Sequence, residues 1–111
     1  MPLDDPVSRL LDQLSGQLSH DKLESFAKEF HRLAQDRAET LTFFVLENVC
    51  RTLASALEGE AVSLERFHEL TREIAEGIAH VLRAVQEGAQ DVEKLQSLVS
   101  SLFRNLALYR H

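Results

Sequence analysis

The sequence predicts an all-α protein, an up-down bundle of four helices that is expected to form a dimer. Helix breakers are scarce, since the only prolines are Pro2 and Pro6 and the 111 residues contain four glycines. Because proline and glycine most often interrupt regular structure, long stretches of backbone are free to stay helical. Apolar residues also recur at spacings of three and four, the period of an amphipathic helix. A chain of this length forms one domain, residues 1–111.

Capping residues and apolar periodicity place the four helices. The predicted ranges are about 6–17, 20–57, 63–87 and 91–109. Asp5 is a suitable N-cap for the first helix, and Pro6 fits the first helical position because its missing N–H would have no partner there. Ser63 can cap the third helix. Gly88 marks its end, since glycine is the residue most often found just after a helix.

The second predicted helix, residues 20–57, is the longest, and Ser19 or Asp21 can cap its start. A continuous helix from Asp21 to Leu57 would be about 55 Å long, far longer than its neighbours. No breaker residue marks an interruption within it. Two alternatives therefore stay open: the overhang belongs to a dimer, or the helix kinks near residues 35–40 and the bundle has five segments.

The second half of that helix, residues 41–57, is apolar on two sides. Eleven of its seventeen residues are apolar, and at 100° per residue they fall on two nearly opposite faces. The first face comprises Leu41, Phe44, Val45, Val49, Leu53 and Ala56; the second comprises Phe43, Leu46, Cys50, Ala54 and Leu57. We expect the first face to point into the core and the second to contact a partner. The predicted interface residues are Phe43, Leu46, Cys50 and Leu57.

The third and fourth helices carry regular apolar seams. The seam of the third helix comprises Leu64, Phe67, Thr71, Ile74, Ile78, Val81 and Val85, and that of the fourth comprises Val92, Leu95, Val99, Leu102, Leu106 and Tyr109, widened by Leu98 and Phe103. Two such helices joined by a short turn should form an antiparallel hairpin. Gly77 lies within the first seam, which favours a close approach of a neighbouring helix there.

Composition excludes several classes of function. The formal net charge is −6, and only the segment that holds Lys94, Arg104 and Arg110 leans basic, which disfavours nucleic acid and anionic membranes as partners. No apolar segment is long enough to cross a membrane or to serve as a secretory signal. The lone Cys50 cannot form an internal disulfide, so we expect a cytoplasmic protein in which this thiol is a small core residue.

Short motifs that suggest metal chemistry are incomplete. Glu65 and His68 have the Glu-x-x-His spacing of carboxylate-bridged di-iron bundles, but only one such motif occurs. The only carboxylate in the apolar helix half, Glu47, has Arg51 one turn on, so a salt bridge is expected there. His20, His31 and His80 share no ligand spacing and are expected at the surface. We therefore expect no metal and no cofactor.

Two further motifs resemble parts of enzyme families. The stretch Glu73-Ile74-Ala75-Glu76 is similar to half of the acidic signature of MazG-like nucleotide pyrophosphohydrolases, whose paired glutamates hold magnesium; the nearest second pair, Glu87 and Asp91, is one residue too far apart. Arg104-Asn105 followed by His111 is similar to the arginine, polar residue and histidine of HEPN-type ribonucleases, which are helical dimers. That resemblance implies that the arginine and the histidine act on an RNA phosphate.

The interpretation that fits most of the sequence is a non-enzymatic interaction module that acts as a homo-oligomer. Its apolar surface exceeds what one small chain can bury, so it should bind a second copy of itself and possibly another protein, as an adaptor, chaperone, regulator or assembly subunit. The alternatives are a HEPN-like ribonuclease, a MazG-like pyrophosphohydrolase, and a small helical subunit of a ribonucleoprotein whose basic C-terminal segment faces the nucleic acid. No resemblance extends over the length of the chain.

Overall fold

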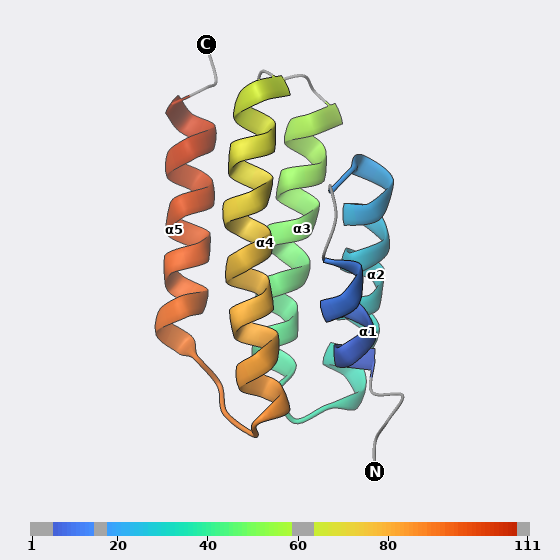
Figure 1. Cartoon of the computed structure of the whole chain (residues 1–111). Helices are drawn as coiled ribbons and strands as arrows, with labels where there is room; N and C mark the ends of the chain where they lie inside the picture. The colour runs from blue at the N-terminus through green and yellow to red at the C-terminus, as the bar shows by residue number, and fades with distance from the viewer. Residues whose placement is uncertain (1–5, 15–17, 59–63, 109–111) are drawn as a thin grey trace.

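The computed structural model describes residues 6–14, 18–58 and 64–108. Five helices make up the regular structure of these residues (Figure 1). They are α1 (Pro6–Gln13), α2 (His20–Asp36), α3 (Thr40–Glu58), α4 (Leu64–Gln86) and α5 (Val92–Leu108). The all-α prediction is confirmed for these ranges. Consecutive helices run in opposite directions, and the radius of gyration of 13.5 Å is close to the roughly 13 Å expected for a compact chain of this length (Figure 1).

The predicted second helix is in fact a hairpin. It is interrupted between Asp36, where α2 ends, and Thr40, where α3 begins. Arg37 adopts an extended backbone (φ −124°, ψ 158°), and its N–H still donates to the carbonyl of Leu33 at 3.0 Å. The hydroxyl of Thr40 lies 2.8 Å from the carbonyl oxygen of Ala34 and 2.6 Å from that of Arg37. The five-segment alternative is therefore correct, and the continuous 55 Å helix is wrong.

Aromatic packing holds α2 against α3. The rings of Phe26 and Phe30 are 6.4 Å apart, and those of Phe30 and Phe43 stack at 6.2 Å. The guanidinium of Arg37 lies 5.9 Å from the centre of the Phe43 ring, so the turn itself is attached to this row by a cation–π contact. The chain can reverse direction here without a proline or glycine because burial of these rings stabilises the hairpin.

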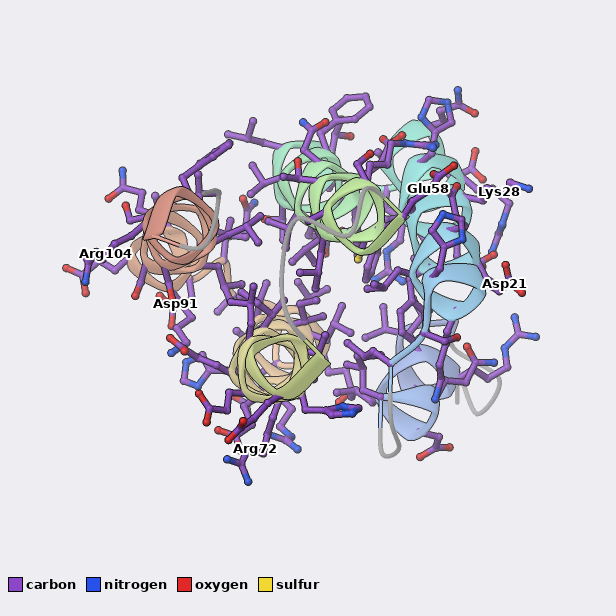
Figure 2. All side chains as sticks on the ribbon, turned by 90° about the horizontal axis from the view of Figure 1, so that it is seen from above. Asp21, Lys28, Glu58, Arg72, Asp91 and Arg104 are labelled. Carbon is purple, nitrogen blue, oxygen red and sulfur yellow. The ribbon has the colours of Figure 1, made fainter. Side chains whose placement is uncertain are left out.

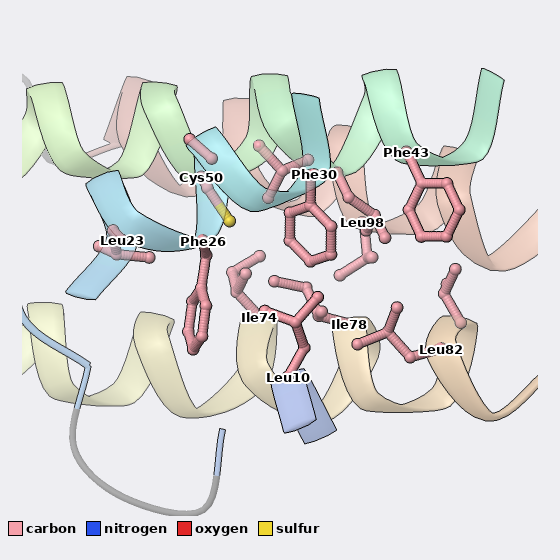
Figure 3. Close-up of a cluster of buried hydrophobic side chains, with 14 of the residues drawn as sticks. Leu10, Leu23, Phe26, Phe30, Phe43, Cys50, Ile74, Ile78, Leu82 and Leu98 are labelled. Carbon is pink, nitrogen blue, oxygen red and sulfur yellow. The ribbon is translucent and has the colours of Figure 1, made fainter. Parts of the chain in front are cut away.

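The core runs between this hairpin and α4. Figure 3 shows the aromatic side chains of α2 and α3 facing a row of aliphatic side chains on α4, with Leu10 of α1 and Leu98 of α5 joining the middle of the cluster. The α4 residues that contribute are Ile74, Ile78 and Leu82, all fully buried. A hydrogen bond of 2.7 Å from the side-chain amide of Gln86 to the hydroxyl of Ser8 ties α1 to α4. The predicted apolar seam of α4 is thus buried wherever its side chains are described.

Local chemistry sets the helix ends. Ser19 is the N-cap of α2 and accepts from the N–H of Lys22. Gly88 ends α4 with φ +81° in a Schellman motif, in which its own N–H donates to Val85 and that of the next residue donates to Ala84. The predicted caps Asp5 and Ser63 lie outside the described residues, as does the stretch 15–17 of the first predicted helix; α1 ends at Gln13.

At Gly77, α4 packs closely against α5. A Cβ atom added there would overlap with the side chain of Leu98 on α5, which is buried. The prediction that this glycine permits close helix approach is confirmed. Glycine weakens an exposed helix by about 1 kcal/mol relative to alanine, so its presence is explained by packing rather than by helix propensity.

We predict that the sign of the stability change for Gly77→Ala depends on Leu98. In the native background the clash outweighs the gain in helix propensity, and the variant loses about 1 kcal/mol of unfolding free energy. In a Leu98→Ala background the space is free, and the same substitution should stabilise by about 1 kcal/mol relative to Leu98→Ala alone. Urea denaturation of the four chains measures both values. An equal effect of Gly77→Ala in the two backgrounds would contradict the packing argument.

Candidate functional site

Three of the four predicted interface residues lie in the core of the single chain. Phe43, Leu46 and Cys50 are fully buried, and burial raises the pKa of the Cys50 thiol to about 12, so it remains a protonated, apolar group at neutral pH. The side chain of Leu57 lies outside the described residues. The assignment of the two α3 faces is therefore wrong in part, because the residues expected to meet a partner pack in the core together with Val49 and Leu53.

The buried arc of α3 takes residues from both predicted faces. Val49 and Leu53 of the first face are buried together with Ala54 of the second. The buried side of α3 therefore lies between the two predicted faces. The part of α3 that remains exposed is the edge of the first predicted face that is farther from the second. Leu41 and Phe44, which were expected in the core, lie on that edge.

The exposed large apolar side chains of the described residues all belong to α3 and α5. Their exposed fractions are Leu41 69%, Phe44 40%, Val92 52% and Phe103 58%. Three of these four line two adjoining grooves of about 480 and 360 Å³ between the helices, which share Val45 and Val99. The residues lining both grooves, here called the α3/α5 face, are Leu41, Thr42, Val45, Asn48, Val49, Thr52, Gln90, Val92, Leu95, Gln96, Val99, Ser100, Leu102 and Phe103.

The α3/α5 face carries no charged side chain, although charged residues make up 27% of the sequence. Its polar members are uncharged, and two of them pair with each other, since the hydroxyl of Thr42 donates to the side-chain carbonyl of Gln90 at 3.3 Å. The charged residues of α3 lie elsewhere. Glu47 pairs with His31 of α2 and with Arg51, and Glu58 pairs with His20 of α2. In Figure 2, Arg104 projects from α5 on the side away from α3. The face is an apolar surface with neutral hydrogen-bonding groups.

A polar cluster on the other side of α3 closes the interface with α2. Glu47 has a side chain only 12% exposed, and its carboxylate accepts from Arg51 Nε at 2.9 Å, as the sequence predicted, and pairs with His31 Nδ1 at 3.1 Å. Gln35 Nε2 lies 3.2 Å from His31 Nε2, so an imidazole that donates to the carboxylate through Nδ1 can accept from the amide. Burial alone would raise the pKa of Glu47, but the hydrogen bonds from Arg51 and His31 lower it overall.

The other histidines predicted at the surface also have acidic neighbours. His80 Nε2 lies 2.9 Å from Asp91, whose second oxygen accepts from the N–H of Lys94 and caps α5. These hydrogen bonds, the backbone one first, lower the pKa of Asp91. His20 Nε2 lies 3.3 Å from Glu58, the residue that ends α3. The His20–Glu58 pair joins two helix ends, and the His80–Asp91 pair joins the start of α5 to α4, so both connect neighbouring elements.

The residues of the enzyme-like motifs do not converge in the structure. Glu73 accepts a hydrogen bond from Ser101 of α5 at 2.7 Å, while Glu76 turns to the opposite side, into a groove beside α1. Asp91 is engaged in the α5 cap. Among the described residues no three His, Cys, Asp or Glu side chains are grouped as metal ligands would be.

For the ribonuclease motif, only Arg104 can be placed, and its side chain is exposed. His111 and the side chain of Asn105 lie outside the described residues. Within the described part of the chain, no helix combines the length and apolarity that a membrane crossing requires.

Comparison with known proteins assigns no family. No family model matches the sequence, and no curated protein and no solved structure matches it significantly.

We predict that Glu47→Gln lowers the unfolding free energy by about 1–2 kcal/mol at pH 7, because the amide keeps the volume but loses the charge-assisted bonds to Arg51 and His31. The folded-state pKa of Glu47 is lowered, so its contribution is present above the unfolded value of 4.5 and is lost as the pH falls below it. Denaturation from pH 7 to pH 3 should therefore show the two chains converging at acid pH.

The matched control for this experiment is Glu87→Gln. Glu87 is exposed and forms no ion pair with the described residues, so its change should stay within about 0.5 kcal/mol at every pH. A constant difference between native chain and Glu47→Gln across the pH range would show that the carboxylate contributes no net charge interaction.

Proposed function

We propose that this chain is a non-enzymatic interaction module that binds a second copy of itself through the α3/α5 face. The observation that carries the proposal is the gathering of three of the four exposed large apolar side chains of the described residues, Leu41, Val92 and Phe103, on that one face. A small soluble chain rarely leaves a contiguous apolar surface open to water unless a partner covers it.

Charge favours a second copy as the partner. Two chains of net charge −6 repel each other, and the repulsion is smallest where charged side chains are kept out of the contact. The α3/α5 face meets that condition. A basic partner would bind more tightly to a surface that carries acidic side chains. The uncharged α3/α5 face is therefore better suited to contact the same face of a second copy.

The size of the face is adequate for association. The α3 part of the face, from Leu41 to Thr52, extends about 17 Å, and two helices side by side are about 20 Å wide. The flat footprint is roughly 340 Å², and the accessible area is larger because the side chains make the surface uneven. This is of the same order as the roughly 800 Å² that each partner of a standard interface buries.

We predict that Phe103→Glu converts the associated species to a monomer. Phe103 lies at the rim of the face with more than half of its side chain exposed, so the change removes apolar contact and adds a like charge on each copy without disturbing the core. Sedimentation equilibrium at high micromolar concentration should give the mass of one chain, 12.6 kDa, for the variant and a multiple of it for the native protein.

The matched control is Ser97→Glu, which adds the same charge to α5 at an exposed position outside the face. It should leave the association unchanged, and circular dichroism should show both variants to be as helical as the native chain. A native protein that sediments as a single chain at high micromolar concentration would refute the proposed function.

A further inference from the structure

A second groove lies between α1 and α4, away from the α3/α5 face. Figure 2 shows α1 beside α4 on the side of the molecule opposite α3, with Arg72 projecting outward there. The groove has a volume of about 440 Å³. Its floor is formed by Leu11, Leu14 and Leu18 before α2 and by Ala75 and Ala79 of α4, and its rim by His68, Thr71, Arg72, Glu76 and Arg83.

The groove exists because α4 has small residues at positions where larger side chains would fill the space. Ala75 and Ala79 are one turn apart, and both are only partly buried. Their side chains end at Cβ, so the backbone of α4 can be approached closely between them. The floor is partly accessible at Leu11, Ala75 and Ala79, whereas Leu14 and Leu18 are buried at its base. It is not fully covered because α1 has only eight residues and does not extend along the length of α4.

Two arginines bracket the alanines along α4. Arg72 and Arg83 are eleven residues apart, which is about three turns, so they lie on the same side of the helix about 16 Å apart. Neither forms an ion pair with the described residues, although Glu76 lies on the rim between them. In contrast, Arg32 and Arg51 on α2 and α3 are paired with carboxylates. The groove is thus an apolar surface with an unmatched positive charge at each end, in a chain of net charge −6.

We propose that the α1/α4 groove docks an amphipathic helix of a second protein, with its apolar side on the leucines and alanines and acidic residues against Arg72 and Arg83. Helix-in-groove recognition uses an apolar stripe for affinity and flanking charges for orientation. Acidic residues about three turns apart on such a helix match the separation of the two arginines. A single carboxylate on an alkyl chain would engage only one of them, so a helix fits better than a fatty acid.

The probe for this proposal is a fluorescent designed peptide, an amphipathic helix with a leucine and alanine stripe and two glutamates eleven positions apart. Its counterpart carries lysines at those two positions. Fluorescence anisotropy should show the glutamate peptide binding at least tenfold more tightly than the lysine peptide, with the preference reduced at high salt. The double variant Arg72→Glu/Arg83→Glu should reverse the preference.

Matched variants make the test specific to the groove. Arg104→Glu changes an exposed arginine on α5 and should leave peptide binding unchanged, whereas Ala79→Leu fills the space above the floor and should weaken it at least tenfold. Binding should persist in Phe103→Glu, so a failure of self-association and a failure of docking are separable. Equal binding of the two peptides, no effect of the double variant, no binding at high micromolar concentration, or displacement of the glutamate peptide by oleate would overturn the proposal.

Discussion

The packing of α2 against α3 is the interaction on which the rest of the structure depends. Small buried residues line both helices, with Ala27 and Ala34 on α2 and Cys50 and Ala54 on α3, and they allow the two backbones to approach closely over their length. The Phe30–Phe43 stack fixes the register of the pair. One side of α3 is covered by α2 and the adjacent side packs in the core. Only the edge of α3 that belongs to the α3/α5 face can therefore be exposed. That geometry, rather than the apolar content of α3 as such, determines where the surplus apolar surface lies.

Features set by local chemistry could be predicted from the sequence, and those set by competition between surfaces could not. The end of α4 at Gly88 and the buried seam through Ile74 and Ile78 follow from residue type and spacing, and both were predicted correctly. The break at Arg37 is not marked by a proline or glycine, and the contacts that stabilise it, such as the one with the Phe43 ring, form only when the chain folds back on itself. The faces of α3 were misassigned for a related reason: periodicity shows that both are apolar but not which lies deeper.

A usable signal for the exposed edge did exist in the sequence. Asn48 and Thr52 lie beside Leu41 and Val45 on α3. Glu47 and Arg51 lie about a third of a turn away, and Glu47 pairs with both Arg51 and His31 of α2. A polar strip that contains a complementary ion pair can be satisfied within one chain. Uncharged polar groups among exposed apolar residues are suited to an interface between molecules, because removing water from them costs less free energy than removing water from charged groups. The distribution of charge was therefore more informative about partners than hydrophobicity.

The two candidate surfaces differ in the selectivity that their chemistry allows. A face without charge discriminates mainly by shape, and shape complementarity is easiest to meet with an identical copy, because a two-fold axis makes every favourable contact occur twice. A groove with fixed positive ends discriminates by charge and spacing, which favours a different, acidic chain and penalises basic ones. Since the grooves involve different helix pairs, α3 with α5 and α1 with α4, occupation of one leaves the other open. A dimer through the first surface would then present two copies of the second, and a partner with two acidic helices would bind it with higher avidity than either site alone provides.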